Sequence, residues 1–153
     1  MTPPLDRATL HAMSTECVCF NLRRTTRAIT QLYDQILDGT GLRSTQVSLL
    51  VAFAEAGPVP SARVAEAVGM DPTTLSRNLQ PLRRAGLITV TAGTPDRRVK
   101  LVTLTAKGRK VLTEVAPKWD EAQRKVVEAL GRDRWNPLRA ELARLTHIAG
   151  AGT

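Results

Sequence analysis

The stretch that decides the fold runs from Asp71 to Thr105 and reads DPTTLSRNLQPLRRAGLITVTAGTPDRRVKLVTLT. Its opening aspartate and proline are typical of a helix cap followed by the first helical residue. Leucines at spacings of four and three over residues 75–82 predict an amphipathic helix that Gly86 ends. Pro81 lies inside this pattern and predicts a local irregularity in the helix.

The second half of the stretch, residues 87–105, has β-prone runs on both sides of a glycine, threonine, proline and aspartate centre. This pattern predicts a two-stranded hairpin with a basic tip. A short helix, residues 62–69, precedes the amphipathic helix, and we expect Ser61 to cap it. Two short helices followed by a hairpin form the order of a winged helix-turn-helix.

Further helices are predicted on both sides of this unit. Residues 16–37 show a helical face that the glycines of 38–41 end, and a second helix starts at a cap, Ser44 or Thr45. Residues 57–60, GPVP, are expected to form a turn. After the hairpin, we expect Thr105 to cap a long helix that runs to residue 130 and that Pro117 bends or interrupts, and a last helix follows Gly131. The predicted fold class is therefore mainly α with a small β-hairpin wing.

The charge of the chain favours a nucleic-acid partner. Lysine and arginine number 22 against 14 acidic residues, which gives a net charge of +8. Residues 71–100 hold six basic and two acidic residues, so 6 − 2 = +4 of that charge is clustered there. Aromatic residues make up only 3%, which argues against a stacking platform for single-stranded nucleic acid. The chain has no apolar run of membrane-spanning length and no signal-peptide pattern, so we expect a cytoplasmic, nucleoid-associated protein.

A helix that enters the major groove reads base edges through short polar and arginine side chains of its first turns. Arginines at a hairpin tip suit a narrow minor groove, whose negative potential attracts them. Arg83 and Arg84 are better placed for phosphates than for bases. The residues expected to contact duplex DNA are Ser44, Ser61, Pro72, Thr73, Thr74, Ser76, Arg77, Asn78, Gln80, Arg83, Arg84, Asp96, Arg97, Arg98 and Lys100.

Two segments carry a resemblance to a known family. LSRNLQPLRRAGLI spans the predicted recognition helix and the following strand, and TPDRRVKLVTLTAKGRKVL spans the wing and the next helix. The second contains an Asp-x-Arg wing pattern at Asp96 and Arg98 and a Leu-x-x-Leu-Thr-x-x-Gly run from Leu101 to Gly108. From about residue 17 to about residue 145, the chain resembles the MarR family of bacterial winged-helix transcriptional regulators.

The resemblance implies a homodimer bound to a palindromic operator, usually a repressor that a small molecule or an oxidant releases. It divides the chain into an N-terminal dimerisation helix (1–40), a winged helix-turn-helix domain (41–105) and C-terminal dimerisation helices (106–153). It also implies an effector, often an aromatic carboxylate or phenol, bound between the helical layer and the winged domain. Candidate effector-lining residues are Arg23, Tyr33, Phe53 and Trp119.

The only two cysteines, Cys17 and Cys19, offer another kind of regulation. The segment VCFNLRRTTRAITQLY is similar to the first helix of the organic-hydroperoxide-sensing branch of the family, where a cysteine at the position of Cys19 is the reactive thiol and a tyrosine stands at Tyr33. On an ideal helix the two thiols lie about 200° apart and do not meet. Inert packing thiols are the plain alternative, and the spacing matches no zinc pattern, so no metal is expected.

Two other classes of function fit the sequence less well. The sequence has no Walker-type phosphate loop and no Gly-x-Ser-x-Gly elbow, and only two histidines limit acid–base chemistry, so no enzyme activity and no cofactor are expected. A helical protein-interaction adaptor is the remaining alternative, although such an adaptor would not need a basic wing.

Overall fold

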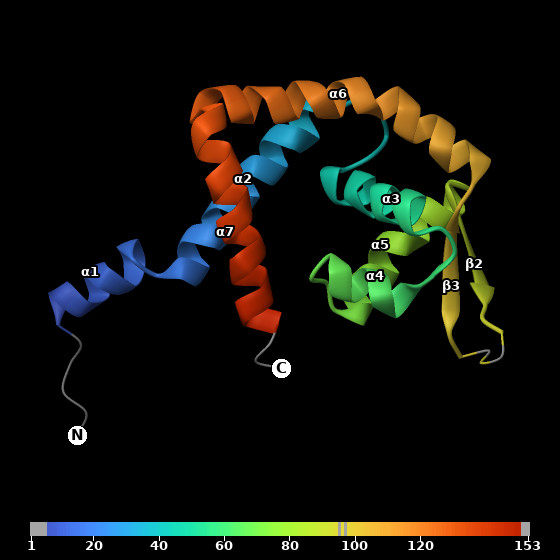
Figure 1. Cartoon of the computed structure of the whole chain (residues 1–153), viewed down its shortest axis with the longest axis horizontal. Coiled ribbons are helices and arrows are strands. Elements are labelled where there is room, and N and C mark those ends of the chain that lie inside the picture. The colour runs from blue at the N-terminus through green and yellow to red at the C-terminus, as the bar shows by residue number, and fades with distance from the viewer. Residues whose placement is uncertain (1–5, 95, 97, 151–153) are drawn as a thin grey trace.

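The computed structural model describes residues 6–94, 96 and 98–150. A winged helix-turn-helix unit lies at one end of the molecule, and helices from both ends of the chain lie at the other (Figure 1). The unit consists of α3 (Ser44–Ala56), β1 (Val59–Pro60), α4 (Ser61–Ala67), α5 (Pro72–Arg84), β2 (Ile88–Ala92) and β3 (Lys100–Leu104). The remaining helices are α1 (Arg7–Thr15), α2 (Val18–Ile36), α6 (Ala106–Leu130) and α7 (Arg132–Gly150). The predicted fold class is confirmed.

The core of the winged unit contains the leucines whose spacing predicted α5. Leu75, Leu79 and Leu82 are buried against α3, α4 and the sheet. Strands β2 and β3 pair antiparallel from Ile88 opposite Leu104 to Ala92 opposite Lys100, which confirms the predicted hairpin. Burial of one leucine face leaves the polar face of α5 pointing outward, as an amphipathic helix requires.

Residues 57–60 differ from the prediction of a simple turn. Val59 and Pro60 form β1, which pairs antiparallel with β3 opposite Val102 and Leu101. The sheet is therefore three-stranded, in the order β1-β3-β2. Proline is tolerated here because an edge strand leaves some backbone N–H groups without a ladder partner.

Two predicted helix caps are also wrong. The residue that caps α3 is Arg43, and Ser44 is already helical. The Arg43 N–H donates to Gln46 Oε1 at 2.9 Å, and the Ser44 N–H donates to Asp34 Oδ1 at 2.7 Å. Pro60, not Ser61, occupies the cap position of α4 and makes no side-chain cap bond. The start of α3 thus depends in part on Asp34, a residue of another helix that the local sequence does not reveal.

Helix α6 links the winged unit to the terminal helices (Figure 1). Its cap is Thr105, as predicted, whose Oγ1 accepts the Gly108 N–H at 3.0 Å. Pro117 does not interrupt the helix, which is continuous from Ala106 to Leu130, although its ribbon changes direction part-way along. Gly108 is buried in the first turn of α6, beside Leu87 and Leu104.

No residue of α1 or α2 is fully buried within the protomer. The predicted helix at 16–37 is α2, which begins at Val18, and the preceding α1 was not predicted. Large apolar side chains on the terminal helices stay exposed, among them Leu10, Met13, Phe20 and Ile148 at 48–60%. Several large apolar side chains exposed on the same helices are typical of a surface that binds another molecule.

Candidate nucleic-acid interface and effector sites

The first turn of α5 is fixed by its cap. Asp71 accepts hydrogen bonds from the Thr74 N–H at 2.9 Å and from Thr74 Oγ1 at 2.5 Å. The hydrogen bond from the Thr74 hydroxyl, together with that from its N–H, holds the pKa of Asp71 below its ordinary value. Pro72 occupies the first helical position, where its missing N–H costs nothing. The start of the predicted recognition helix is therefore well defined.

The structure divides the predicted α5 residues into two groups. Thr74 and Asn78 are half-buried and bonded within the helix, since Asn78 Nδ2 donates to the Thr74 carbonyl at 2.9 Å. Pro72 is exposed at the start of the helix. The side chains that lie exposed on the outer face are Thr73, Ser76, Arg77, Gln80, Arg83 and Arg84.

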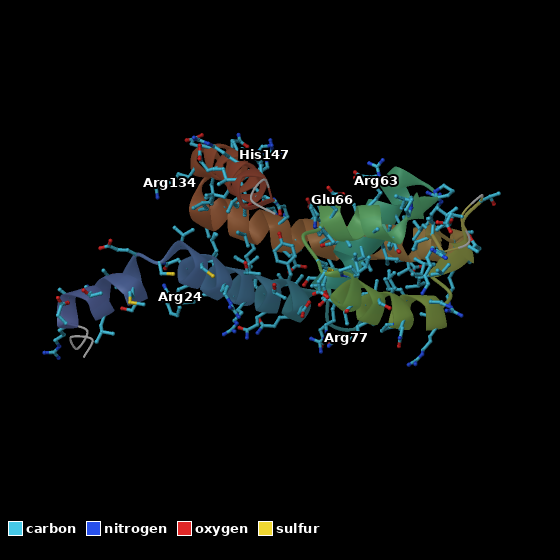
Figure 2. The ribbon with its side chains drawn as sticks, turned by 90° about the horizontal axis from the view of Figure 1, so that it is seen from below. Arg24, Arg63, Glu66, Arg77, Arg134 and His147 are labelled. Atoms are coloured by element: carbon cyan, nitrogen blue, oxygen red, sulfur yellow. The ribbon has the colours of Figure 1, made fainter. Side chains whose placement is uncertain are left out.

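Figure 2 shows Arg77 projecting from the side of the molecule opposite to Arg63 and Glu66 of α4. No ion pair joins Arg77, Arg83 or Arg84 to a carboxylate within the described residues. Their charges therefore remain available to a polyanion.

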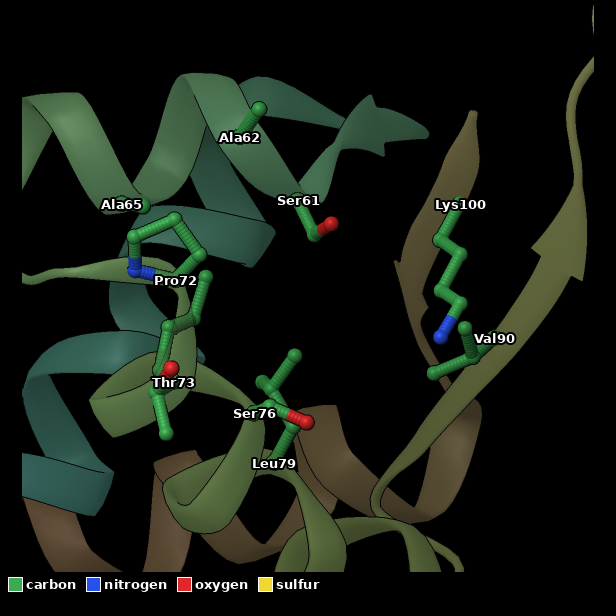
Figure 3. Close-up of a pocket in the computed structure, with 10 residues that line it drawn as sticks. Ser61, Ala62, Ala65, Pro72, Thr73, Ser76, Leu79, Val90 and Lys100 are labelled. Atoms are coloured by element: carbon green, nitrogen blue, oxygen red, sulfur yellow. The ribbon is translucent and has the colours of Figure 1, made fainter. Parts of the chain in front are cut away.

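A cavity of about 410 Å³ lies between α4, α5 and the sheet. Ser61 of α4, Ser76 of α5 and Lys100 of β3 line it together with Pro72 and Thr73 (Figure 3). The Lys100 side chain extends from its strand toward this space. The structure thus brings hydroxyls and one ammonium from three elements to the same hollow, an arrangement that suits a phosphate or a sugar edge.

Asp96 holds the backbone of the wing tip with two hydrogen bonds. Asp96 Oδ1 accepts the Arg98 N–H at 2.9 Å, and the Asp96 carbonyl accepts the Val99 N–H at 3.2 Å. Asp96 therefore shapes the turn and leaves Arg98 exposed. Arg97, also predicted to contact DNA, lies outside the described residues.

The backbone of Ser44 anchors the start of α3, and its contact with DNA stays a prediction. Its N–H is bonded to Asp34 of α2, whose carboxylate also accepts from Arg43 Nη1 at 3.4 Å. Although burial works to raise the pKa of Asp34, the hydrogen bonds from Ser44 and the charge of Arg43 hold it below its ordinary value. Asp34 thus ties α2 to the start of α3. Sequence reasoning missed Asp34 because its partners lie on another helix.

The predicted effector residues do not form one site. Phe53 is fully buried in the winged-unit core, so its expected place in an effector cavity is wrong. Tyr33 donates from its hydroxyl to Gln123 Oε1 of α6 at 2.6 Å, and burial raises the pKa of Tyr33. Trp119, which is 45% exposed, lines a separate, mostly apolar cavity of about 600 Å³ between α3 and α6.

Arg23 lies with the cysteines. A groove of about 630 Å³ on α2, which we call the α2 groove, is lined by residues that include Cys17, Cys19, Phe20, Arg23, Arg24 and Arg27. Tyr33 is fourteen residues beyond Cys19, about 21 Å along a helix, so the two do not meet within one protomer. The sequence prediction missed Arg24 and Arg27, because a run of charges is more often a solvated helix face.

The cysteines do not share one helix. Cys17 caps α2 in an extended conformation, with ψ 114°, and its Sγ accepts the Phe20 N–H at 3.5 Å. Only Cys19 is helical, so the 200° separation expected on an ideal helix does not apply. Both thiols are free and exposed.

The described residues contain neither a cluster suited to a metal ion nor a helix suited to span a membrane. No cluster of three or more histidine, cysteine, aspartate or glutamate side chains is placed to hold a metal ion in the described ranges. None of the described helices combines the length and the apolar character that a membrane crossing needs.

Comparison with known proteins agrees with this architecture. A helix-turn-helix domain family matches residues 42–91. The transcriptional regulator MosR of M. tuberculosis, solved in complex with DNA, is 38% identical; the match covers 88% of this chain and 97% of that chain with a TM-score of 0.79. A MarR-family regulator from a Rhodococcus species is 26% identical over 86% of this chain and 95% of its own, with a TM-score of 0.76.

A third solved structure contains a bound small molecule. CouR from Rhodococcus jostii, bound to p-coumaroyl-CoA, is 28% identical over 86% of this chain and 93% of its own, with a TM-score of 0.73. The match to MosR covers 88% of this chain, far more than the helix-turn-helix segment alone. The chain therefore belongs to the MarR family of winged helix-turn-helix transcriptional regulators.

Proposed function

We propose that the protein is a homodimeric repressor that binds a palindromic duplex operator through α5 and the wing. The observation that carries this proposal is the outer face of α5, where exposed hydroxyl and guanidinium groups follow a firmly capped first turn. Thr73, Ser76 and Arg77 would read base edges in the major groove. Arg83 and Arg84, near the end of the helix, would bind phosphates.

The wing would complete the interface from the side. Arg98, and Arg97 beside it in the sequence, would enter the adjacent minor groove. Lys100 and Ser61 line the cavity next to α5. They would bind the sugar-phosphate backbone of the DNA strand that passes between α5 and the wing. MosR, solved with DNA bound, supports this use of the fold.

The exposed apolar side chains of α1, α2 and α7 support dimerisation. Phe20 is 48% exposed and Ile148 is 59% exposed, although both side chains are large and apolar. A second copy of the chain would bury them, because symmetric dimers pair the same surface patch on both protomers. The two recognition helices would then meet half-sites about one helical turn apart, ~34–36 Å.

An aromatic or phenolic effector would suit the cavity between α3 and α6. Val51, Leu112 and Trp119 give it apolar walls, and the hydroxyls of Ser48 and Thr113 supply hydrogen-bond partners. Its volume lies within the range usual for small-molecule sites. A ligand there would contact both the winged unit and α6, so it could favour one spacing of the recognition helices over another.

The cysteines favour a second candidate, a thiol-based sensor. Both are exposed and line one groove on α2, so an oxidant could reach them. DNA release by an organic peroxide would be compared for wild type, Cys19→Ser and Cys17→Ser. Loss of the response in Cys19→Ser alone would support the sensor, and equal responses in all three would remove the thiols from the mechanism.

The test of DNA recognition uses operator-like sequences selected from a random duplex pool by the wild-type protein. Binding of the winning sequence is then measured by fluorescence anisotropy for Arg77→Ala and Arg98→Ala. Each change should weaken binding by about 1–3 kcal/mol. Arg134→Ala, on α7, is the matched control and should bind like wild type. Full affinity in both test variants would contradict the assignment of α5 and the wing.

A further inference from the structure

The winged unit is joined to the terminal helices at a junction where the end of α2, the start of α3 and the middle of α6 meet. Each of the three contributes one residue to a small buried core, which we call the junction core: Leu37, Val47 and Val115. Apolar packing holds the three helices together, but it is non-directional. The junction core alone therefore does not fix the angle between α2 and α3.

Asp34 makes the polar contact between α2 and α3. One of its carboxylate oxygens accepts the Ser44 N–H at 2.7 Å, and the other accepts Arg43 Nη1 at 3.4 Å. The first bond is the stronger tie, because the Ser44 N–H lies in the first turn of α3 and has no acceptor within the helix. The Arg43 side chain is 74% exposed, so its ion pair adds little. A hydrogen bond is directional, and this one therefore fixes an angle as well as a distance.

Helix α2 is bonded to α6 independently of Asp34. The Tyr33 hydroxyl donates to Gln123 Oε1 of α6, and Lys118 Nζ of α6 donates to the Asp38 carbonyl, just beyond the end of α2. Figure 1 shows α6 passing over the end of α2 on its way from the winged unit to α7. Helices α2 and α6 thus form one frame, and Asp34 holds the start of α3 to that frame.

We propose that Asp34 is a positioning residue that fixes the orientation of the winged unit and so makes the dimer selective for one half-site spacing. The inference rests on the proposed function, because only a dimer bound to two half-sites has a spacing to select. Helix α3 shares its core with α4, α5 and the sheet, so a rotation of α3 at the junction moves α5 with it. Asp34 is not itself a DNA contact, because its carboxylate repels phosphates.

A change in half-site spacing measures how firmly the winged unit is held. One added base pair shifts a half-site by about 3.4 Å along the duplex and turns it by about 34–36°. One winged unit must then leave its orientation if both half-sites are to be bound. In wild type this movement breaks the hydrogen bond from Ser44 to Asp34, whereas Asp34→Ala has no such bond to lose. Relative to the native spacing, the variant should therefore bind the altered spacing about fivefold better than wild type does.

The experiment uses the full chain and the operator that the wild-type protein selects from a random duplex pool. The same operator is also made one base pair longer and one base pair shorter between its half-sites. Fluorescence anisotropy gives the affinity of wild type, Asp34→Ala and Asp34→Asn for each duplex. The readout is the ratio of the affinities for native and altered spacing, because a general gain or loss of DNA affinity cancels in this ratio.

Two variants separate positioning from charge and from stability. Asp34→Asn removes the charge but keeps an acceptor for the Ser44 N–H, so it should retain most of the wild-type ratio. Ile88→Val changes the buried core of the winged unit outside the junction core. It should lower Tm and leave the ratio at the wild-type value.

A lower ratio in Asp34→Ala, with ratios near wild type in Asp34→Asn and Ile88→Val, supports the proposal. A wild-type ratio in Asp34→Ala overturns it, and so does equal weakening at every spacing, because Asp34 then only stabilises the fold or the dimer. If wild type selects no inverted repeat, the proposed function itself is wrong and the inference falls with it. A selected repeat whose spacing ratio Asp34→Ala leaves unchanged contradicts this inference alone.

Discussion

Replacing Gly108 with alanine should destabilise the fold, although alanine is the better helix former. A Cβ atom at this position would lie 2.2 Å from the Leu87 carbonyl oxygen and 2.6 Å from Leu104 Cδ1. The Leu87 carbonyl cannot move freely, because it accepts the Thr105 N–H at 3.0 Å and the Thr105 hydroxyl at 3.1 Å. Leu104 is 4% exposed and belongs to the core. The start of α6 would have to move away from the sheet.

The magnitude follows from two opposing effects. Alanine gains about 1 kcal/mol of helix propensity over glycine. The new carbon would be about 1 Å closer to the Leu87 oxygen than a relaxed carbon–oxygen contact of about 3.3 Å. Forcing an extra carbon into a packed interior costs about 1–3 kcal/mol, and the upper end applies where the neighbour is backbone. The net loss should be about 2 kcal/mol, or a fall of about 4–8 °C in Tm.

Thermal unfolding followed by circular dichroism measures this loss at a fixed protein concentration, because dimer stability depends on concentration. Lys110→Ala, on an exposed position of the same helix, is the control and should stay within about 0.5 kcal/mol of wild type. A Gly108→Ala protein as stable as the control would show that α6 does not approach the sheet this closely.

Two further predictions concern helix starts. Asp71→Ala should lower Tm and weaken operator binding, because the Thr74 N–H loses its acceptor; Asp71→Asn, which keeps an acceptor, should lose less. Asp34→Ala should reduce the free energy of unfolding at pH 7 by about 1 kcal/mol, since the Ser44 N–H and Arg43 lose their partner. The folded-state pKa of Asp34 is lowered, so its contribution is complete above the ordinary value of 3.8 and is lost as the pH falls below it. Urea unfolding of wild type and variant at several pH values should therefore show the difference shrinking in acid, and a difference that grows in acid would contradict this account.

The winged unit could be predicted from sequence because its signals are local. The cap Asp71, the leucine period of α5 and the Gly/Pro centre of the hairpin each lie within a few residues of the element they define. The cap Thr105 was predicted for the same reason. By contrast, β1 has only two residues and exists because β3 lies beside it.

The sequence misled where a partner came from elsewhere in the chain. Serine is a residue type common at helix caps, which is why Ser44 was expected to cap α3. In the structure, Ser44 is helical and its N–H donates to the carboxylate of Asp34 on α2. Phe53 was expected at an effector site because the family resemblance implies an effector between the helical layer and the winged domain, but the side chain is fully buried in the core of the winged unit. Arg24 and Arg27 were not predicted as site residues, because charged residues close together in a sequence do not show which groove they line. These contacts depend on the tertiary structure, and a local sequence pattern does not predict them.

The central claim is that a symmetric dimer reads duplex DNA with α5 and the wing. Selecting binding sites for the full chain from a random duplex pool tests this claim most directly. The account predicts an inverted repeat whose half-site centres lie about one helical turn, ~10–10.5 base pairs, apart. It further predicts that changing one half-site reduces affinity and that Arg77→Ala enriches this repeat less strongly than the wild-type protein does. Enrichment of a single unpaired site, or of no sequence by the wild-type protein, would contradict the claim.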